Sequence, residues 1–548
     1  MVTRVWRYAP FLAWPLVVAI ALAFRVPIAI DETRYLTVAW EMHWGGDWLV
    51  PHLNGEYYTH KPPLLFWLID AGWRVFGVSA WWPRLVPLLA SLAAWIVLWR
   101  LARRLWPQIE EVPPFAVILA GGTLVWSLTG TLIMFDMLLA LWVLVGMLGL
   151  ARAGEGEARG WLLVGAALGL GILTKGPVAL LHLLLPAVLG PWWSARARQA
   201  PRAWYLHLLA SFALGALIAL AWVIPAALSG GAEYREMILW KQTADRLASS
   251  FAHRRPFWWY LPLLPVLFLP WVMWRPSWDA LRNAGGLADQ GTRFCIAWAL
   301  PVFLVFCVIS GKQPQYLLPV TPAVALIAAR ALAPSYAMSY RAGRALALLP
   351  WLALGIAMAA ALVVKGDWHG GWLEDVHPAW SIGVLLVLAW AILPFRVSLL
   401  EGAARLQVAM ALSLSLVAAG LLGSATGRPY GVDGAAREVA SLQAGGVTVG
   451  YYGDYHGQFG FAGRLRHPVR ELWSPGDIAA LAAQEPTAVV VLESRGNPLE
   501  AAPLLPSSVM AYRTGFWSIW SARRLADNPG VLDTIRARGP RGEAAAME

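Results

Sequence analysis

Runs of about 20 apolar residues recur along this chain, and a helix of about that length is needed to cross the ~30 Å core of a bilayer. Only 14% of the 548 residues are charged, against roughly 25% in soluble domains. The sequence therefore predicts an α-helical polytopic membrane protein. About thirteen spans are expected, at residues 9–30, 84–104, 113–130, 134–150, 161–174, 177–193, 204–228, 259–275, 293–310, 315–333, 345–364, 379–395 and 405–423.

The loops between these spans alternate in charge. With the N-terminus in the cytoplasm, every inner loop carries arginine, as the positive-inside rule requires. The outer side then holds 31–83, 229–258, 311–314, 365–378 and the segment after 423. The first run is expected to be a span, not a cleaved signal, because it has full length and no A-x-A-like site follows it. The alternative to two short spans here is a single span with a break at 174–177 inside the membrane. It would invert the membrane orientation of all later spans.

Three regions are expected from these patterns. Residues 1–423 form a transmembrane domain, whose first outer loop, 31–83, contains two amphipathic stretches, 31–46 and 63–78, that read as helices lying in the interface. Residues 424–525 form a small soluble α/β or α+β domain, with strands near 448–452, 488–492, 509–512 and 517–520 and helices at 434–444 and 476–484. The tail, 526–548, is expected to be disordered.

The polar stretch Asp31-Glu32-Thr33-Arg34-Tyr35 follows the first span directly. On a helix Asp31, Arg34 and Tyr35 share one face, because they are three and four residues apart. The structural interpretation is an acidic residue at a helix N-terminus with interfacial anchors. The functional interpretation is a carboxylate that accepts a proton or binds a metal, beside an arginine that holds a phosphate.

Other outer segments repeat this mixture of cations and aromatic rings. They are Tyr57 to Pro63 with Tyr58, His60 and Lys61, then His253 to Tyr260 with Arg254 and Arg255, and Gly311 to Tyr316 with Lys312. Interfacial anchoring explains each one singly. Asp136, at the outer end of the fourth span, is a candidate because carboxylates in apolar surroundings are costly. Several cations on the outer side are contrary to the positive-inside rule. An anionic lipid headgroup bound on this face would explain them.

The first outer loop resembles that of the lipid A aminoarabinose transferases, in Asp31 to Tyr35, Gly46 to Gly55 and Tyr57 to Leu64. These are polyprenyl-phosphate-dependent glycosyltransferases of the GT-C class, related to protein O-mannosyltransferases. The resemblance continues at Leu173 to Pro177, His253 to Tyr260 and Lys312 to Pro319. It covers 1–423 and is specific in the first loop.

The resemblance implies a sugar donor on undecaprenyl phosphate and an acceptor in the same leaflet. It makes Asp31 the catalytic carboxylate, and Asp136 is a second candidate because of its apolar surroundings. The resemblance implies that Arg34, Lys61 and either Arg254 or Arg255 bind the lipid phosphate. The further substrate-binding candidates in the same outer segments are Tyr35, Tyr58, Lys312 and Tyr316. His253 matches a metal ligand, and His60 stands where the family usually has Glu. A divalent metal, zinc or another, is therefore a possible cofactor with these two histidines as ligands.

The resulting hypothesis is a bacterial inner-membrane glycosyltransferase with its N-terminus in the cytoplasm and its C-terminus in the periplasm. It would transfer a sugar, 4-amino-4-deoxy-L-arabinose or a similar one, to lipid A or a related acceptor. The alternatives are a transferase acting on a protein or an envelope polysaccharide, and a flippase for lipid-linked sugars. The protein is expected to be a monomer. No nucleic-acid partner is expected, because the net charge of +11 is spread over short inter-helix loops.

Overall fold

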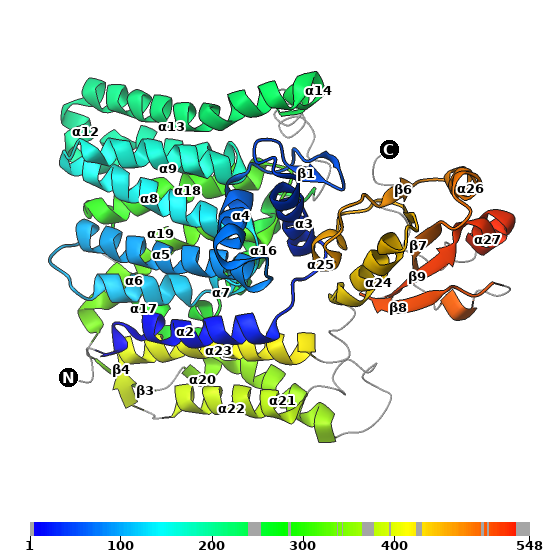
Figure 1. Ribbon diagram of the computed structural model, residues 1–548. Helices are drawn as coiled ribbons and strands as arrows, with labels where there is room; N and C mark the ends of the chain where they lie inside the picture. Colours follow the sequence, from blue (N-terminus) through cyan, green and yellow to red (C-terminus); the bar gives the residue numbers. More distant parts are fainter. Residues whose placement is uncertain are drawn as a thin grey trace.

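A helical bundle and a smaller domain built on a β-sheet make up the molecule (Figure 1). The structure is a computed structural model, and it describes residues 5–238, 254–282, 286–336, 338–341, 344–363, 377–393, 396–423, 430–494, 498–500, 504–513 and 515–532.

Six helical segments among the described residues are long and apolar enough to cross a membrane. They are α5 (Trp81–Leu105), α8 (Phe135–Glu155), α13 (Pro201–Ser229), α18 (Gln290–Val308), the segment Pro314–Ser335 that contains α19 (Thr321–Leu332), and α23 (Leu399–Gly423). Shorter apolar helices lie beside them: α2 (Ala9–Phe24), α6 (Val112–Gly121), α10 (Val178–Val188), α16 (Tyr260–Leu267), α21 (Leu349–Val363) and α22 (Pro378–Ile392). The polytopic helical architecture is confirmed, and the count of thirteen spans stays a prediction.

Loops assigned to one side of the membrane gather at one end of the bundle. α12 (Ala195–Gln199) and the antiparallel pair β3 (Ser339–Arg341) and β4 (Arg396–Ser398) lie at the end where the N-terminus is drawn (Figure 1). The first outer loop and α14 (Gly231–Glu236) lie at the other end, beside the smaller domain. This arrangement agrees with the alternation expected from the arginines.

Several expected spans are shorter or interrupted. The first helix ends at Phe24, not at residue 30, and Arg25 begins an extended turn. The third is divided into α6 and α7 (Leu124–Thr129), because Thr123 adopts an extended conformation and its hydroxyl caps α7. The eighth is reduced to α16 and 3₁₀ turns in a stretch rich in proline, which interrupts helical hydrogen bonding.

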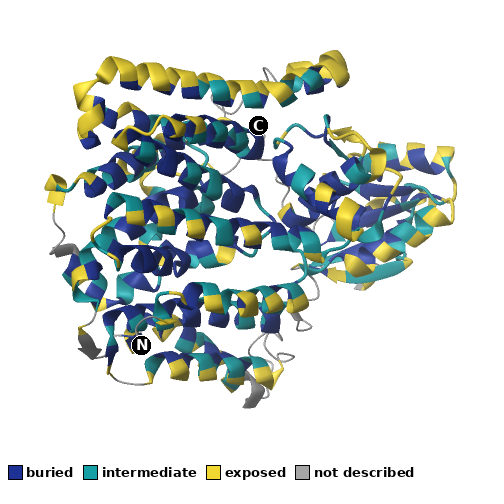
Figure 2. Cartoon of the chain, turned by 60° about the vertical axis from the view of Figure 1, so that its left-hand side comes forward, coloured by how far each residue is buried: buried dark blue, intermediate teal, exposed yellow. Residues whose placement is uncertain are grey.

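Apolar side chains cover the outside of the bundle. On α13, Leu206, Leu209 and Leu217 are about two-thirds exposed, and Figure 2 shows this helix as a largely exposed layer along one edge. A contiguous apolar surface of this kind would be unfavourable in water and fits contact with lipid chains.

The first outer loop forms the two helices expected from its pattern. α3 (Asp31–Gly45) ends at Gly46, whose φ of +74° is a conformation that glycine adopts without strain. A short hairpin of β1 (His52–Leu53) and β2 (Glu56–Tyr57) follows, and then α4 (Leu64–Phe76). α3 and α4 pack against each other, so the polar clusters of this loop share one compact unit.

The C-terminal domain contains a five-stranded mixed sheet in the order β6-β5-β7-β9-β8. Its strands are β5 (Val449–Tyr452), β6 (Arg470–Leu472), β7 (Val489–Ser494), β8 (Ser508–Tyr512) and β9 (Gly515–Ser521), and its helices are α24 (Asp433–Ala444), α25 (Gly460–Gly463), α26 (Pro475–Gln484) and α27 (Ala522–Asp527). β5 pairs in parallel with β6 and β7, whereas β9 is antiparallel to β7 and β8. Val491 packs into a core with α24, and its neighbour Val490 into a core with α26, because successive strand residues face opposite sides. All four expected strands and both helices are present.

Candidate active site at the N-terminus of α3

Asp31 and Arg34 form an ion pair on the first turn of α3. The Asp31 side chain is half exposed, and that of Arg34 is 24% exposed, so both can be reached by a ligand. Burial alone would lower the pKa of the guanidinium, but the nearby Tyr58, Tyr35 and Asp31 together raise the pKa of Arg34 above its ordinary value. The expected carboxylate–arginine combination is thus present, with a permanent cation beside the acid.

Glu32 is buried and anchors this turn to the bundle. Its carboxylate pairs with both terminal nitrogens of Arg25, at 2.5 and 2.9 Å. It also accepts the backbone N–H groups of Ile28 at 2.9 Å and of Ile133 at 2.7 Å. Sequence reasoning assigned no role to Arg25 or Glu32. The signal was available, because a charge inside the first apolar run needs a partner.

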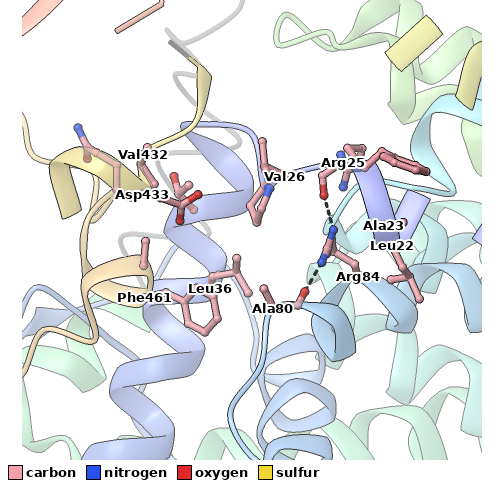
Figure 3. A pocket seen from close by; sticks show the side chains of 15 residues that line it. Leu22, Ala23, Arg25, Val26, Leu36, Ala80, Arg84, Val432, Asp433 and Phe461 are labelled. Atoms are coloured by element: carbon pink, nitrogen blue, oxygen red, sulfur yellow. Dashed lines mark hydrogen bonds between the residues drawn. The ribbon is translucent and has the colours of Figure 1, made fainter. Parts of the chain in front are cut away.

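The end of α2 is held against the start of α5 by Arg84. Its guanidinium donates to the carbonyl oxygens of Arg25 and of Ala80, the latter at 2.9 Å (Figure 3). These groups line one side of a cavity of about 200 Å³ whose other side is formed by the C-terminal domain, through Asp433 and Phe461. Both domains therefore meet around the first turns of α3.

Tyr35 connects α3 to a second ion pair. Its buried ring packs edge-to-face on Phe135, at 5.0 Å between centroids. Burial first, and then Asp31 and Tyr58, raise the pKa of the Tyr35 hydroxyl well above its usual value, so it stays a neutral donor. Asp136, next to Phe135 in the chain, contributes to the same shift and so lies nearby.

Asp136 is paired with Lys175, at 2.5 Å between Oδ1 and Nζ. The Asp136 side chain is 3% exposed, so it is shielded from bulk solvent. The Lys175 ammonium also lies 4.6 Å from the centroid of the Tyr316 ring. A cation over an aromatic face is favourable. The structure thus brings three predicted site residues, Tyr35, Asp136 and Tyr316, into one line of contacts.

The second cluster of the first loop lies beside α3 and α4. Tyr58 is buried and its ring stacks on that of His60, with centroids 5.4 Å apart. Tyr58 also raises the pKa of Arg34, so the two side chains lie near each other. His60 is exposed and Lys61 half-buried, just before the proline pair that leads into α4.

Arg254, Arg255 and Lys312 form a third group, on two chain segments that run side by side. Arg254 and Gly311 form an isolated antiparallel β-bridge, and the Arg255 N–H donates to the Ser310 carbonyl at 3.0 Å. Both arginines are exposed. Lys312 is only 2% exposed, and its Nζ donates to the carbonyl oxygens of Arg255 and Ile309. The Lys312 ammonium therefore links the two segments. Its role in substrate binding stays a prediction.

Comparisons with known proteins identify the family. A profile described as dolichyl-phosphate-mannose-protein mannosyltransferase matches residues 60–228. An undecaprenyl phosphate-alpha-4-amino-4-deoxy-L-arabinose arabinosyl transferase of Erwinia tasmaniensis is 31% identical over 68% of this chain and 69% of its own length. The chain belongs to this arabinosyl transferase family.

Other members and a solved structure agree with this assignment. The Pseudomonas paraeruginosa arabinosyl transferase is 34% identical over 58% of this chain, and the match spans 59% of that relative's length. The crystal structure of ArnT from Cupriavidus metallidurans bound to undecaprenyl phosphate has a TM-score of 0.70 at 22% identity, covering 93% of this chain and 96% of that one. This likeness shows that the arabinosyl transferase fold extends through both domains.

The family resemblance implies a metal with His60 and His253 as its ligands. Among the described residues, no group of three or more His, Cys, Asp or Glu side chains is arranged to hold a metal ion. His60 lies against the Tyr58 ring, and His253 falls outside the described residues. Metal ligation by these two histidines stays a prediction.

Proposed function

We propose that this protein is an integral-membrane glycosyltransferase that moves a sugar from undecaprenyl phosphate to lipid A or a related acceptor. The best candidate for the sugar is 4-amino-4-deoxy-L-arabinose, which the names of the relatives carry. The observation that supports this most directly is the Asp31–Arg34 pair, accessible at the first turn of α3 and surrounded by Tyr35 and Tyr58.

The proposed reaction is a displacement at the anomeric carbon of the donor sugar. An acceptor oxygen forms the new bond, and the bond to the phosphate oxygen breaks, so that undecaprenyl phosphate leaves with the electron pair. Arg34, Lys61 and the arginines at 254 and 255 would stabilise the charge that develops on this leaving group. Fixed cations are effective here because they need no reorganisation during the reaction.

Asp31 has one of two roles, according to the acceptor. Where the acceptor is a hydroxyl, the Asp31 carboxylate would take its proton as the new bond forms. Where the acceptor is a phosphate, no proton must leave, and Asp31 would orient the donor sugar. Asp136 is engaged by Lys175, so its proposed contribution is to hold that cation and Tyr316 in place.

The arrangement in the cell belongs to the same proposal. Residues 1–423 would form the transmembrane catalytic domain, with loop 31–83 on the periplasmic face of the bacterial inner membrane. Residues 424–525 would form a periplasmic domain, and the N-terminus would lie in the cytoplasm. The position of the first loop beside the C-terminal domain, at the end away from the N-terminus, supports this topology (Figure 1). The working unit would be a monomer.

A protein acceptor is the second candidate. The profile that matches residues 60–228 is that of protein mannosyltransferases, and it includes Lys61 and α4. Lipid A mass spectrometry on a strain lacking this gene would separate the two candidates. Loss of a sugar from lipid A supports the main proposal, and unchanged lipid A with an underglycosylated protein supports the second.

The main test is Asp31→Asn in a transfer assay with purified protein, donor lipid and lipid A. We expect kcat to fall by about 10²-fold or more, as for removal of a general base or an aligned charge. Mass spectrometry of the lipid product measures the rate. Near-normal turnover of Asp31→Asn would contradict the assignment of the site.

A matched control is Glu56→Gln. Glu56 is an exposed carboxylate in the hairpin of the same outer loop, and its replacement removes the same charge. We expect turnover close to that of the unaltered protein. A comparable loss in both variants would mean that general surface charge is responsible, not the Asp31 site.

A further inference from the structure

A short segment of the C-terminal domain lies against α3. This docking segment, Gly457 to Leu465, includes α25. The Thr37 hydroxyl of α3 donates to the Gly457 carbonyl at 2.6 Å and accepts the Phe461 N–H at 3.0 Å. Thr37 is 1% exposed. One buried hydroxyl thus satisfies two backbone groups of the other domain, more than 400 residues away in the chain.

Glycine at position 460 is required by this contact. A Cβ atom added to Gly460 would lie 2.3 Å from Cγ2 of Thr37 and 2.9 Å from its Oγ1. These separations are far below van der Waals contact, so any side chain at position 460 must push the two elements apart. The backbone of the docking segment therefore lies directly on α3.

Further bonds extend the contact on both sides of Thr37. The Trp40 indole donates to the Leu465 carbonyl at 2.8 Å. Asn54, in the hairpin after α3, exchanges two hydrogen bonds with the Val469 backbone, each 2.8 Å long. Phe461 stacks on Trp73 of α4, with centroids 5.2 Å apart and planes within 3°. The domain therefore contacts α3, the hairpin and α4 together.

The contact begins one turn after the proposed site on α3. Trp40 is nine residues after Asp31 and lies across the helix from it, whereas Thr37 is three residues after Arg34 and so lies on the same flank, one turn further along. Along the axis Thr37 is only about 9 Å from Asp31. α3 is thus fixed by the Glu32 anchor at its first turn and by the docking segment one to two turns later.

We propose that the C-terminal domain is a positioning element for the proposed reaction, and that Thr37 and Gly460 are its positioning residues. The docking segment holds α3 in the rotation and height at which the carboxylate of Asp31 and the guanidinium of Arg34 face the donor. This inference rests on the proposed function for the identity of the reaction, but the contact it invokes can be measured without turnover.

The test uses the full chain in lipid nanodiscs with Gly460→Ala. The added methyl group displaces α3, and a 1 Å misplacement can cost about 10²-fold in rate, so we expect kcat to fall at least tenfold. The KM for the lipid donor should change less than kcat, because Lys61 and the arginines at 254 and 255 are not carried by α3 and only Arg34 of the proposed phosphate-binding cations moves with it. Hydrogen exchange at residues 31–37 should become faster.

Rescue distinguishes positioning from general loss of structure. Thr37→Ser removes Cγ2, the atom in the closest contact, and keeps the hydroxyl, whose oxygen stays at 2.9 Å from the added Cβ. The double variant Thr37→Ser/Gly460→Ala should therefore recover part of the turnover and of the exchange protection. A control is Gly434→Ala on α24, where the nearest atom is the sulfur of Met510 at 3.9 Å. This variant should behave as the unaltered protein.

The outcomes separate this inference from the proposed function. Turnover of Gly460→Ala within twofold of the unaltered protein, or no rescue by Thr37→Ser, would overturn the positioning role. If the unaltered protein transfers no sugar while exchange responds as expected, the proposed function fails and only the contact between domain and α3 is supported.

Discussion

The buried pair of Arg25 and Glu32 is the residue-scale feature that fixes where α3 begins. Both side chains are less than a tenth exposed, and the carboxylate of Glu32 accepts four hydrogen bonds from Arg25, Ile28 and Ile133. Such a group is stable only while every partner is present, because a buried charge without one retains its full desolvation cost. Asp31 owes its accessible position to this neighbour.

We predict that Glu32→Gln destabilises the protein by about 3–5 kcal/mol, the cost of leaving one member of a buried ion pair unpaired. The amide keeps the size of the side chain but leaves Arg25 without its counter-charge. Chemical denaturation in detergent measures the change, with the exposed Glu56→Gln as reference. A loss no larger than that of the reference would contradict the anchoring role.

At the scale of elements, α8 and α9 (Arg159–Lys175) form the most closely packed helix pair near the site. Near the turn that connects the two helices, Gly149 and Gly160 allow backbone contact, since a Cβ on Gly160 would lie 2.5 Å from the Gly149 carbonyl oxygen. At the other end Asp136, in the first turn of α8, pairs with Lys175, the last residue of α9. The two helices are therefore held at both ends.

The second prediction concerns this helix pair. Asp136→Asn should destabilise the protein more than the double variant Asp136→Asn/Lys175→Gln, because the single change leaves the ammonium of Lys175 without a counter-charge. For groups in contact the coupling is expected at about 1–3 kcal/mol. Thermal unfolding of the four proteins of the cycle in nanodiscs measures it. Additive effects would mean that the two charges do not interact.

For the whole molecule, the gathering of loops at two ends of the bundle predicts which residues reach each compartment. In a variant lacking Cys295 and Cys307, Glu56→Cys should react with a membrane-impermeant maleimide in intact spheroplasts. Arg198→Cys, in the exposed α12 at the opposite end, should react only after the membrane is permeabilised. Labelling of both residues in intact spheroplasts would contradict the proposed topology.

The sequence was sufficient for most features that depend on local pattern. Apolar length indicated the membrane helices, and short apolar runs indicated four of the five strands of the C-terminal sheet, but not β6. The i, i+3 and i, i+4 spacing placed Asp31, Arg34 and Tyr35 on one face of α3. Local signals also marked the first-loop helices. They overestimated the first, third and eighth spans, since the bond from Thr123 to α7 and the proline turns outweighed apolar length there.

Only the tertiary structure decided which distant residues are partners. Asp136 lies 39 residues from Lys175, and Thr37 lies 420 residues from Gly457, so no periodicity links either pair. The N-terminal stretch Asp31 to Tyr35 was evident from its chemistry alone. What holds it in place was not, because a buried ion pair and a backbone lying on a threonine arise from packing between segments, which a linear pattern does not encode.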